Sequence, residues 1–500
     1  MSNMRRRPSP ILGFSRSWRL GNFGLGISSS GIMRGPMTLT WNGAGADNNW
    51  STSSNWVGSL VPINGDSLVF TGATRLTPVN NMASLAPASI AFPGGSVFSV
   101  SGNQVLMANG SLTSSSAVGQ GLATPVAITG GLTVGGTSAQ SLDLTGVLSG
   151  AGTLTKTGSN TVTITAIPTY TGATTISAGT LKLAVTNMAS VSYAVSSGAV
   201  LEVSPGSATS ITSNTTITGA GTLRKTGAGT FVFGSAVLTM SMGAGSLIDV
   251  VVGEFTGGNF GNEVWTSNLA DLAIASGAIF DGIEANVRVN SVSGVGSLKT
   301  GYTGAGYVET TIGVNNGTGA TFSGVIADSI NPGSIRKSGT GTQTLSGTST
   351  YTGTTTVDGG TLSITGSLSA SSAVTLDGGA LRGTGTVGAV TVANTANSAI
   401  QGGVGAAGTL TTGTLTFNGS TAALRVKTDG TSTVSVVAAT TVTLGSVTVN
   451  FDTGLALTAG TYNVITGTSM TGTATQGTLP PGRTWTSLTV VANNLVAVLA

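Results

Sequence analysis

The sequence predicts an all-β fold, a parallel β-helix that extends from about residue 40 to the end. Three observations support this: a composition suited to strands and turns, apolar residues that alternate with period two, and a unit that recurs. Charged residues make up only 7% of the 500 residues, against about 25% in ordinary domains. Glycine contributes 78 residues and hydrophobic residues 39%. The chain therefore has enough apolar material for a core, with frequent turns.

The recurring unit is clearest in segments 150–183 and 333–364. Each places a lysine, Lys156 or Lys337, fourteen residues before a tyrosine, Tyr170 or Tyr351, with G-T-L nine residues after the tyrosine. A third copy at 219–234 contains the first half only. Because one such unit cannot bury its apolar face alone, the repeats predict coils that stack into a solenoid.

Within each copy the apolar residues alternate with polar ones, as in T-L-K-L and T-V-T-I-T. This period indicates strands with one buried face, and glycine-containing segments such as S-A-G-T separate them as turns. At roughly 20–25 residues a coil and about 4.8 Å a step, the rod would be on the order of 100 Å long. The side chains expected to face inward are Leu154, Val162, Ile164, Ile176, Leu181, Leu362 and Ile364.

Four segments are predicted along the chain. Residues 1–37 form a basic extended docking arm, 38–140 the N-terminal cap and first coils, 141–423 the repeat β-helix, and 424–500 a C-terminal β cap. Three of the six tryptophans, Trp41, Trp50 and Trp56, lie in the segment assigned to the N-terminal cap. The last segment has longer alternating strands than the repeats, which is why we assign it to the other cap.

The arm is distinct in charge. Six arginines precede the first acidic residue, Asp47, so residues 1–46 carry +6, while the other 13 basic and 16 acidic residues sum to −3. Such a segment with apolar residues gains order by docking on a partner; the plainer alternative is a poorly structured soluble tail. We expect no specific nucleic-acid partner. The expected docking residues are Arg5, Arg6, Arg7, Ile11, Phe14, Arg16, Trp18, Arg19 and Phe23.

The sequence predicts no catalytic residue, no cofactor and no metal. The chain has no histidine and no cysteine, which excludes Ser-His-Asp triads and histidine or thiolate metal sites. Asp281 and Glu284 lie in the densest acidic patch and could serve a polysaccharide-cleaving enzyme, but Asp281-Gly282 is also ordinary turn chemistry. The GxGxxG match at 383–388 precedes a predicted strand, where no pyrophosphate site forms.

Tyr170 and Tyr351 could form a ladder that stacks on carbohydrate. Their matched positions in the repeat favour packing instead.

On these residues the sequence resembles the autotransporter-associated β-strand repeat family. The resemblance rests on segments 150–183 and 333–364, the W-N-G-x-G-x-D-N-N-W opening at Trp41, and the segment 311–328. It implies a right-handed parallel β-helix displayed on a surface. We find no recognisable secretory leader, no membrane helix and no translocator segment, so a phage virion member of this family is our expectation.

The function we expect is therefore that of a non-enzymatic structural protein: a virion decoration, fibre or spike-stem β-helix, anchored by its arm to capsid or tail proteins. One alternative is a bacterial cell-surface adhesin that contacts host-cell glycans, with an extracellular location. A second alternative is a β-helical polysaccharide-cleaving enzyme. We expect a homo-oligomer, a trimer by analogy with other virion rods.

Overall fold

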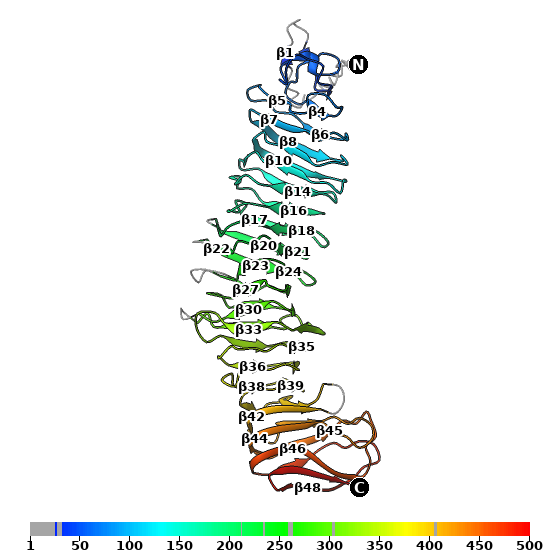
Figure 1. Ribbon diagram of the computed structural model, residues 1–500, viewed down its shortest axis with the longest axis vertical. Coiled ribbons are helices and arrows are strands. Elements are labelled where there is room, and N and C mark those ends of the chain that lie inside the picture. Colours follow the sequence, from blue (N-terminus) through cyan, green and yellow to red (C-terminus); the bar gives the residue numbers. More distant parts are fainter. Residues whose placement is uncertain are drawn as a thin grey trace, which may run out of the picture.

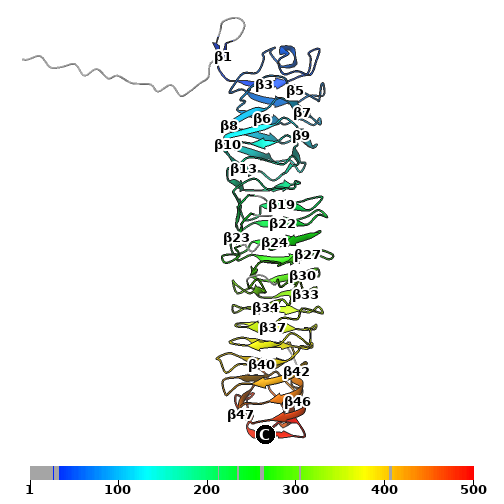
Figure 2. The same ribbon diagram turned by 90° about the vertical axis from the view of Figure 1, so that its left-hand side faces the viewer.

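The structure is a computed structural model of the chain, and it describes residues 26–27, 33–211, 213–233, 236–258, 264–302, 306–404 and 408–500. The chain forms one elongated rod whose coils follow the sequence from end to end (Figures 1 and 2). Nearly all regular structure is β; among the described residues one short 3-10 turn, η1 (Ser53–Asn55), is helical. The predicted all-β parallel β-helix is confirmed.

One parallel ladder, which we call the long sheet, follows almost the whole rod with nineteen strands. Its strands repeat every 19 to 28 residues, as in Leu362 opposite Leu381 and Gly294 opposite Phe322. The strands are β5 (Val79–Asn80), β7 (Ser99–Gly102), β9 (Gln120–Leu122), β11 (Leu142–Leu144), β14 (Thr161–Ile164), β16 (Thr180–Leu183), β18 (Val200–Val203), β21 (Thr222–Lys225), β24 (Leu247–Val250), β26 (Asp271–Ile274), β29 (Val292–Gly294), β32 (Ala320–Phe322), β35 (Thr342–Leu345), β37 (Thr361–Ile364), β39 (Ala380–Gly383), β41 (Ala399–Gly402), β43 (Ala423–Val426), β45 (Val447–Phe451) and β47 (Ala474–Gln476).

Three shorter sheets supply the other walls of the coils. The amino-half sheet contains β3 (Thr38–Trp41), β4 (Ser67–Phe70), β6 (Ser89–Phe92), β8 (Val105–Ser114), β10 (Val126–Gly136), β12 (Leu148–Ser149), β13 (Thr153–Thr157), β15 (Thr174–Ile176), β17 (Ser192–Val195), β20 (Thr215–Gly219) and β23 (Leu238–Met242). The middle sheet contains β19 (Thr209–Ile211), β22 (Phe231–Phe233), β25 (Glu254–Thr256), β27 (Ile279–Asp281), β30 (Ser297–Thr300) and β33 (Val325–Asp328).

The carboxyl-half sheet takes over in the second half of the rod. It contains β28 (Arg288–Val289), β31 (Glu309–Ile312), β34 (Ser334–Lys337), β36 (Thr355–Val357), β38 (Val374–Leu376), β40 (Val390–Val392), β42 (Thr409–Phe417), β44 (Val436–Thr443), β46 (Gly460–Thr471), β49 (Asn494–Leu499) and β48 (Trp485–Val491). Its last strands pair antiparallel, β46 with β49 and β49 with β48. The parallel stacking therefore ends in an antiparallel hairpin.

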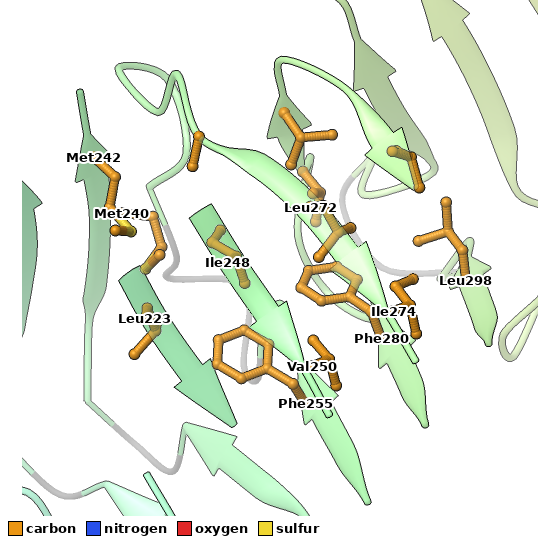
Figure 3. Close-up of a cluster of buried hydrophobic side chains, with 14 of the residues drawn as sticks. Leu223, Met240, Met242, Ile248, Val250, Phe255, Leu272, Ile274, Phe280 and Leu298 are labelled. Carbon is orange, nitrogen blue, oxygen red and sulfur yellow. The ribbon is translucent and has the colours of Figure 1, made fainter. Parts of the chain in front are cut away.

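The core is a continuous stack of apolar side chains inside the coils. In Figure 3, Leu223, Ile248 and Leu272 follow one another on the long sheet, and the rings of Phe255 and Phe280 stack with centroids 5.4 Å apart. Each coil thus buries its apolar face against the next, because a single coil has too little surface to do so. All seven side chains predicted to face inward are fully buried, which confirms the period-two interpretation.

Aromatic side chains fill the N-terminal end of the rod. The rings of Trp41 and Trp56 meet edge to face at 5.2 Å, and Trp50 contacts Trp56 at 6.2 Å in the same way. Phe70 lies within 6.0 Å of all three tryptophans. Edge-to-face pairs of this kind stabilise a core beyond their buried area, so this cluster strengthens the packing at the N-terminal end of the rod.

Three lysines of the repeat are buried inside turns. The ammonium of Lys156 donates to the carbonyl oxygens of the next two residues, at 2.8 Å each, and to that of Ala178 in the next coil at 3.0 Å. Lys225 and Lys337 bond the equivalent carbonyls. Burial lowers the pKa of each lysine to about 8. At neutral pH the ammonium groups remain mostly charged and join consecutive turns.

Candidate binding groove

The outer face of the long sheet carries one column of polar side chains in register along the rod. We call it the outer column. Between β16 and β24 it consists of charges that alternate in sign: Lys182, Glu202, Arg224 and Asp249. Lys182 pairs with Glu202 at 2.8 Å, and Arg224 with Asp249 at 2.9 Å. In this part of the rod the charges neutralise one another.

The same column changes character between β37 and β45. Its members there are in register from strand to strand: Ser363, Arg382, Gln401, Arg425 and Asn450. This stretch contains two arginines and two amides but no carboxylate. Ser363 and Gln401 are buried, Arg382 and Asn450 are half-buried, and Arg425 is exposed. This part of the column therefore offers mainly the hydrogen-bond donors of its two arginines and of Asn450, without the acidic partners found earlier in the rod.

Two grooves adjoin this stretch. One, of about 480 Å³, is lined mainly by Gln401, Arg425, Lys427, Asn450, Asp452 and Thr478. The second, of about 500 Å³, is lined by turn backbone together with Asp358, Asn397 and Arg425. Arg425 borders both grooves and is exposed.

The cations of this region differ in how they are neutralised. Lys427 pairs with Asp452, and the hydrogen bond from Lys427 lowers the pKa of that carboxyl group. Arg336 pairs with both Glu309 and Asp358.

Arg425 and Arg382 have no such partners. Within the described part of the chain, no side chain pairs with Arg425, and the buried Nε of Arg382 has no hydrogen-bond partner. The half-buried guanidinium group of Arg382 and the exposed one of Arg425, which lie on either side of the strand that carries Gln401, thus lack an acidic partner among the described residues.

The amides between and beside the two arginines are held in place. Gln401 is only 7% exposed, and its Nε2 makes a single long bond of 3.4 Å to the Gly403 carbonyl. The Oδ1 atom of Asn450 accepts the backbone N–H of Thr478 at 3.0 Å. Since that oxygen faces Thr478, the amino group of Asn450 is left to donate elsewhere.

These groove residues were not predicted from the sequence. A signal was present in the phrases A-L-R-G at 380–383, A-I-Q-G at 399–402 and A-L-R-V at 423–426, which recur at coil spacing. Their third letters form the unpaired stretch of the outer column. Only the strand register shows that the three side chains are neighbours, and that no acid lies between them.

The acidic pair considered for catalysis has structural partners. Asp281 is almost fully buried, accepts the hydroxyl of Ser329 at 3.0 Å and the N–H of Ile283 at 3.1 Å, and lies 3.9 Å from the Lys299 ammonium. Burial raises the pKa of Asp281. Glu284 adopts a left-handed backbone, with φ 57°, in the following turn. These contacts organise a turn, as Asp281-Gly282 indicated. Among the described residues, no three acidic side chains are grouped to hold a metal ion.

The two repeat tyrosines are packing residues. Tyr170 and Tyr351 are fully buried, and their hydroxyls bond Thr174 and Thr355 four residues later, at 2.7 and 2.6 Å. The GxGxxG match begins at the last residue of β39 and passes through bends to β40, so a strand and not a helix follows it. The expected docking residues between Arg5 and Phe23 all lie outside the described residues.

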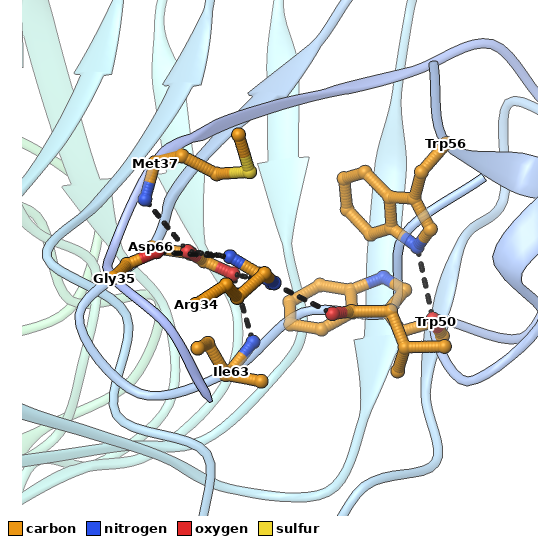
Figure 4. Close-up of polar contacts among 8 residues, drawn as sticks. Arg34, Gly35, Met37, Trp50, Trp56, Ile63 and Asp66 are labelled. Carbon is orange, nitrogen blue, oxygen red and sulfur yellow. Dashed lines mark hydrogen bonds and ion pairs between the residues drawn. The ribbon is translucent and has the colours of Figure 1, made fainter. Parts of the chain in front are cut away.

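Arg34 is the one arginine of the arm that the structure describes. Its guanidinium makes a two-pronged ion pair with the buried Asp66, at 2.8 and 2.6 Å, and also bonds the Val61 carbonyl at 2.8 Å (Figure 4). The carboxylate of Asp66 additionally accepts the N–H groups of Met37 and Ile63, at 2.9 and 2.8 Å. This network ties the end of the arm to the first coils of the rod.

The structure is a parallel β-solenoid with a polar groove on its outer face and buried repeat lysines. Two segments, 154–183 and 335–364, match the passenger-associated-transport-repeat model. These matches agree with the resemblance found in the sequence and cover 60 of the 500 residues. No curated protein matches the chain in sequence. Within the described ranges, no helix is long and apolar enough to cross a bilayer.

Proposed function

We propose that the protein is a non-enzymatic, surface-displayed rod of the adhesin type. The observation that supports this most is the ladder of nineteen parallel strands, two segments of which match the passenger-associated transport repeat. A stack of this kind separates its two ends by roughly 85 Å, at about 4.8 Å for each step between neighbouring strands. It can therefore hold a contact face away from the surface that anchors it.

The finer proposal concerns which surface carries the rod. The basic arm with its apolar residues favours docking on an assembled protein surface, where arginines meet carboxylates and apolar anchors enter grooves. A virion capsid or tail is such a surface. Our first proposal is therefore that the rod is a virion decoration, fibre or spike stem. Our second proposal is a cell-surface adhesin, which is favoured by the groove beside arginines that have no acidic partner. In either version we propose a homo-oligomer, with a trimer as the first expectation.

Localisation of the native protein tests the proposal. Antibodies against the rod should label intact particles or cells, and external protease should release rod peptides without lysis. Mass spectrometry of purified virions separates the versions: rod peptides at structural stoichiometry support the virion. Their absence, with labelling of intact cells, supports the cell surface. Rod peptides found only after lysis, with no labelling of either surface, would refute surface display.

A further inference from the structure

We propose that the stretch Arg382–Gln401–Arg425–Asn450 of the outer column binds an acidic polysaccharide, a chain of sugars that bears carboxylate or sulfate groups. The proposal rests on the proposed surface function, and names the ligand class for its contact face. The arginines along the outer column differ in whether they have an acidic partner. The arginine at β21 has its own carboxylate, whereas those at β39 and β43 have none among the described residues.

The two guanidinium groups set the charge of the ligand. An unpaired arginine presents a planar fork of donors that matches a carboxylate or a sulfate through two parallel hydrogen bonds. The neighbouring Lys427 is already neutralised by Asp452. The groove that Arg425 borders with Gln401 and Asn450 therefore carries a net positive charge, which favours anions over neutral ligands.

The distance between the two arginines sets the spacing of the anionic groups that a ligand needs. Arg382 is in register with Gln401, and Gln401 with Arg425, so the two arginines lie two strands apart. Two strand steps correspond to about 10 Å between their backbones. A polymer that crosses the strands and carries an anionic group on every second sugar would meet both guanidinium groups in turn.

The remaining groups suit sugar hydroxyls. Gln401 is an almost fully buried amide in the wall of the groove, and Asn450 is oriented by Thr478, so both can meet hydroxyls without first being ordered. The groove's one aromatic residue, Phe451, is buried and stacks edge-on against Trp485. Single-stranded nucleic acids bind on exposed aromatic platforms, and Phe451 does not provide one.

The test measures binding of oligosaccharides to the full chain. Titration calorimetry would compare an oligogalacturonate, a sulfated dextran and neutral dextran of equal length. We expect binding of the acidic sugars that weakens as salt rises, and no measurable binding of neutral dextran. The double variant Arg382→Gln/Arg425→Gln should bind at least ten-fold more weakly. The single variant Arg425→Lys, which keeps the charge but loses the fork, should show an intermediate loss.

Arg224→Gln is the matched control, because Arg224 occupies the same outer column but is paired with Asp249. It should bind like the wild-type chain, and circular dichroism should show equal folding of all variants. The carboxylated and sulfated probes separate the two sources of negative charge; an equal loss of both in the double variant supports the shared anion chemistry. Equal binding by the double variant, equal binding of neutral dextran, or no binding of either acidic probe would overturn the site. Surface labelling, which needs no ligand, would be unaffected by that failure.

Discussion

At the scale of single residues, the buried lysines show how strand parity decides the role of a side chain. Lys156 and Lys299 both occur in the tripeptide K-T-G. Lys156 stands two positions after an inward leucine and points into the turn, whereas Lys299 stands one position after Leu298 and points outward. The outward lysine reaches Glu254 and Asp281 at 3.9 Å each. The same tripeptide therefore contains a buried lysine that bonds turn carbonyls in one coil and a partly exposed lysine that faces carboxylates in another.

Replacement of Lys156 by methionine should destabilise its coil by about 2–4 kcal/mol, because three buried carbonyls lose their donor. Lys299→Met is the matched control and should cost less than about 1 kcal/mol, as expected for a partly exposed ion pair. Amide hydrogen exchange of peptides that cover each coil measures the local opening free energy. Similar losses in the two variants would show that the lysine carbonyl contacts contribute little.

At single positions, the sequence predicts which strand residues face inward but not which charged side chains are buried. The inward positions of Leu154 and Leu362 follow from alternation alone, because a strand has only two faces. The matched tyrosines were correctly assigned to packing. The burial of Lys156 was not predicted, because a charged side chain is expected outside unless its partners are known. Those partners are backbone carbonyls of the same turn and of the next coil, which only the fold brings together.

At the scale of strands and turns, glycines let neighbouring coils approach closely. Gly339 follows the Lys337 turn with φ 65°, and a Cβ added there would lie 2.1 Å from the Gly313 carbonyl oxygen of the adjacent coil. Gly198 has a similar φ of 77°, but a Cβ added there would meet no atom within 4 Å. The two positions separate backbone conformation from coil-to-coil contact.

Gly198→Ala should cost about 1–2 kcal/mol, the penalty of a left-handed backbone with a Cβ. Gly339→Ala should cost roughly 2–5 kcal/mol, because displacement of the neighbouring coil adds to the same penalty. Hydrogen exchange in β31 and β34 should rise in the Gly339 variant, while the Gly198 variant should change only its own turn. Equal effects would mean that the coils can separate at little cost.

The elements differ in how far the sequence predicts them. Parallel stacking followed from the repeats, since each copy needs a neighbour to bury its face. The antiparallel end formed by β46, β49 and β48 was predicted only as a cap without a topology. The buried residues of β48 and β49 do not alternate strictly, and the chain reverses between these strands at Ala492 and Asn493, whose φ values are 48° and 62°. Alternation alone does not distinguish a hairpin from another coil.

At the scale of the whole molecule, the connection between the arm and the rod is a buried ion pair. The carboxylate of Asp66 is fully buried, and Arg34 supplies the charge opposite it. A buried carboxylate that loses its partner destabilises a fold by about 3–5 kcal/mol. The end point of a truncation therefore decides whether this ion pair survives. Removal of residues 1–32 keeps Arg34 and the pair, whereas removal of residues 1–37 deletes Arg34 and breaks the pair.

The shorter truncation, which lacks residues 1–32, should leave the rod folded with unchanged hydrogen exchange in β3 and β4. The longer truncation, which lacks residues 1–37, should raise exchange in those strands and expose the tryptophan cluster. Tryptophan fluorescence would report that exposure, since Trp41, Trp50 and Trp56 are fully buried in the intact end. Arg34→Met in the full chain is the matched point variant, and should reproduce the loosened end without loss of the arm. If both truncations leave β3 and β4 equally protected, the Arg34–Asp66 pair does not hold the N-terminal end of the rod together.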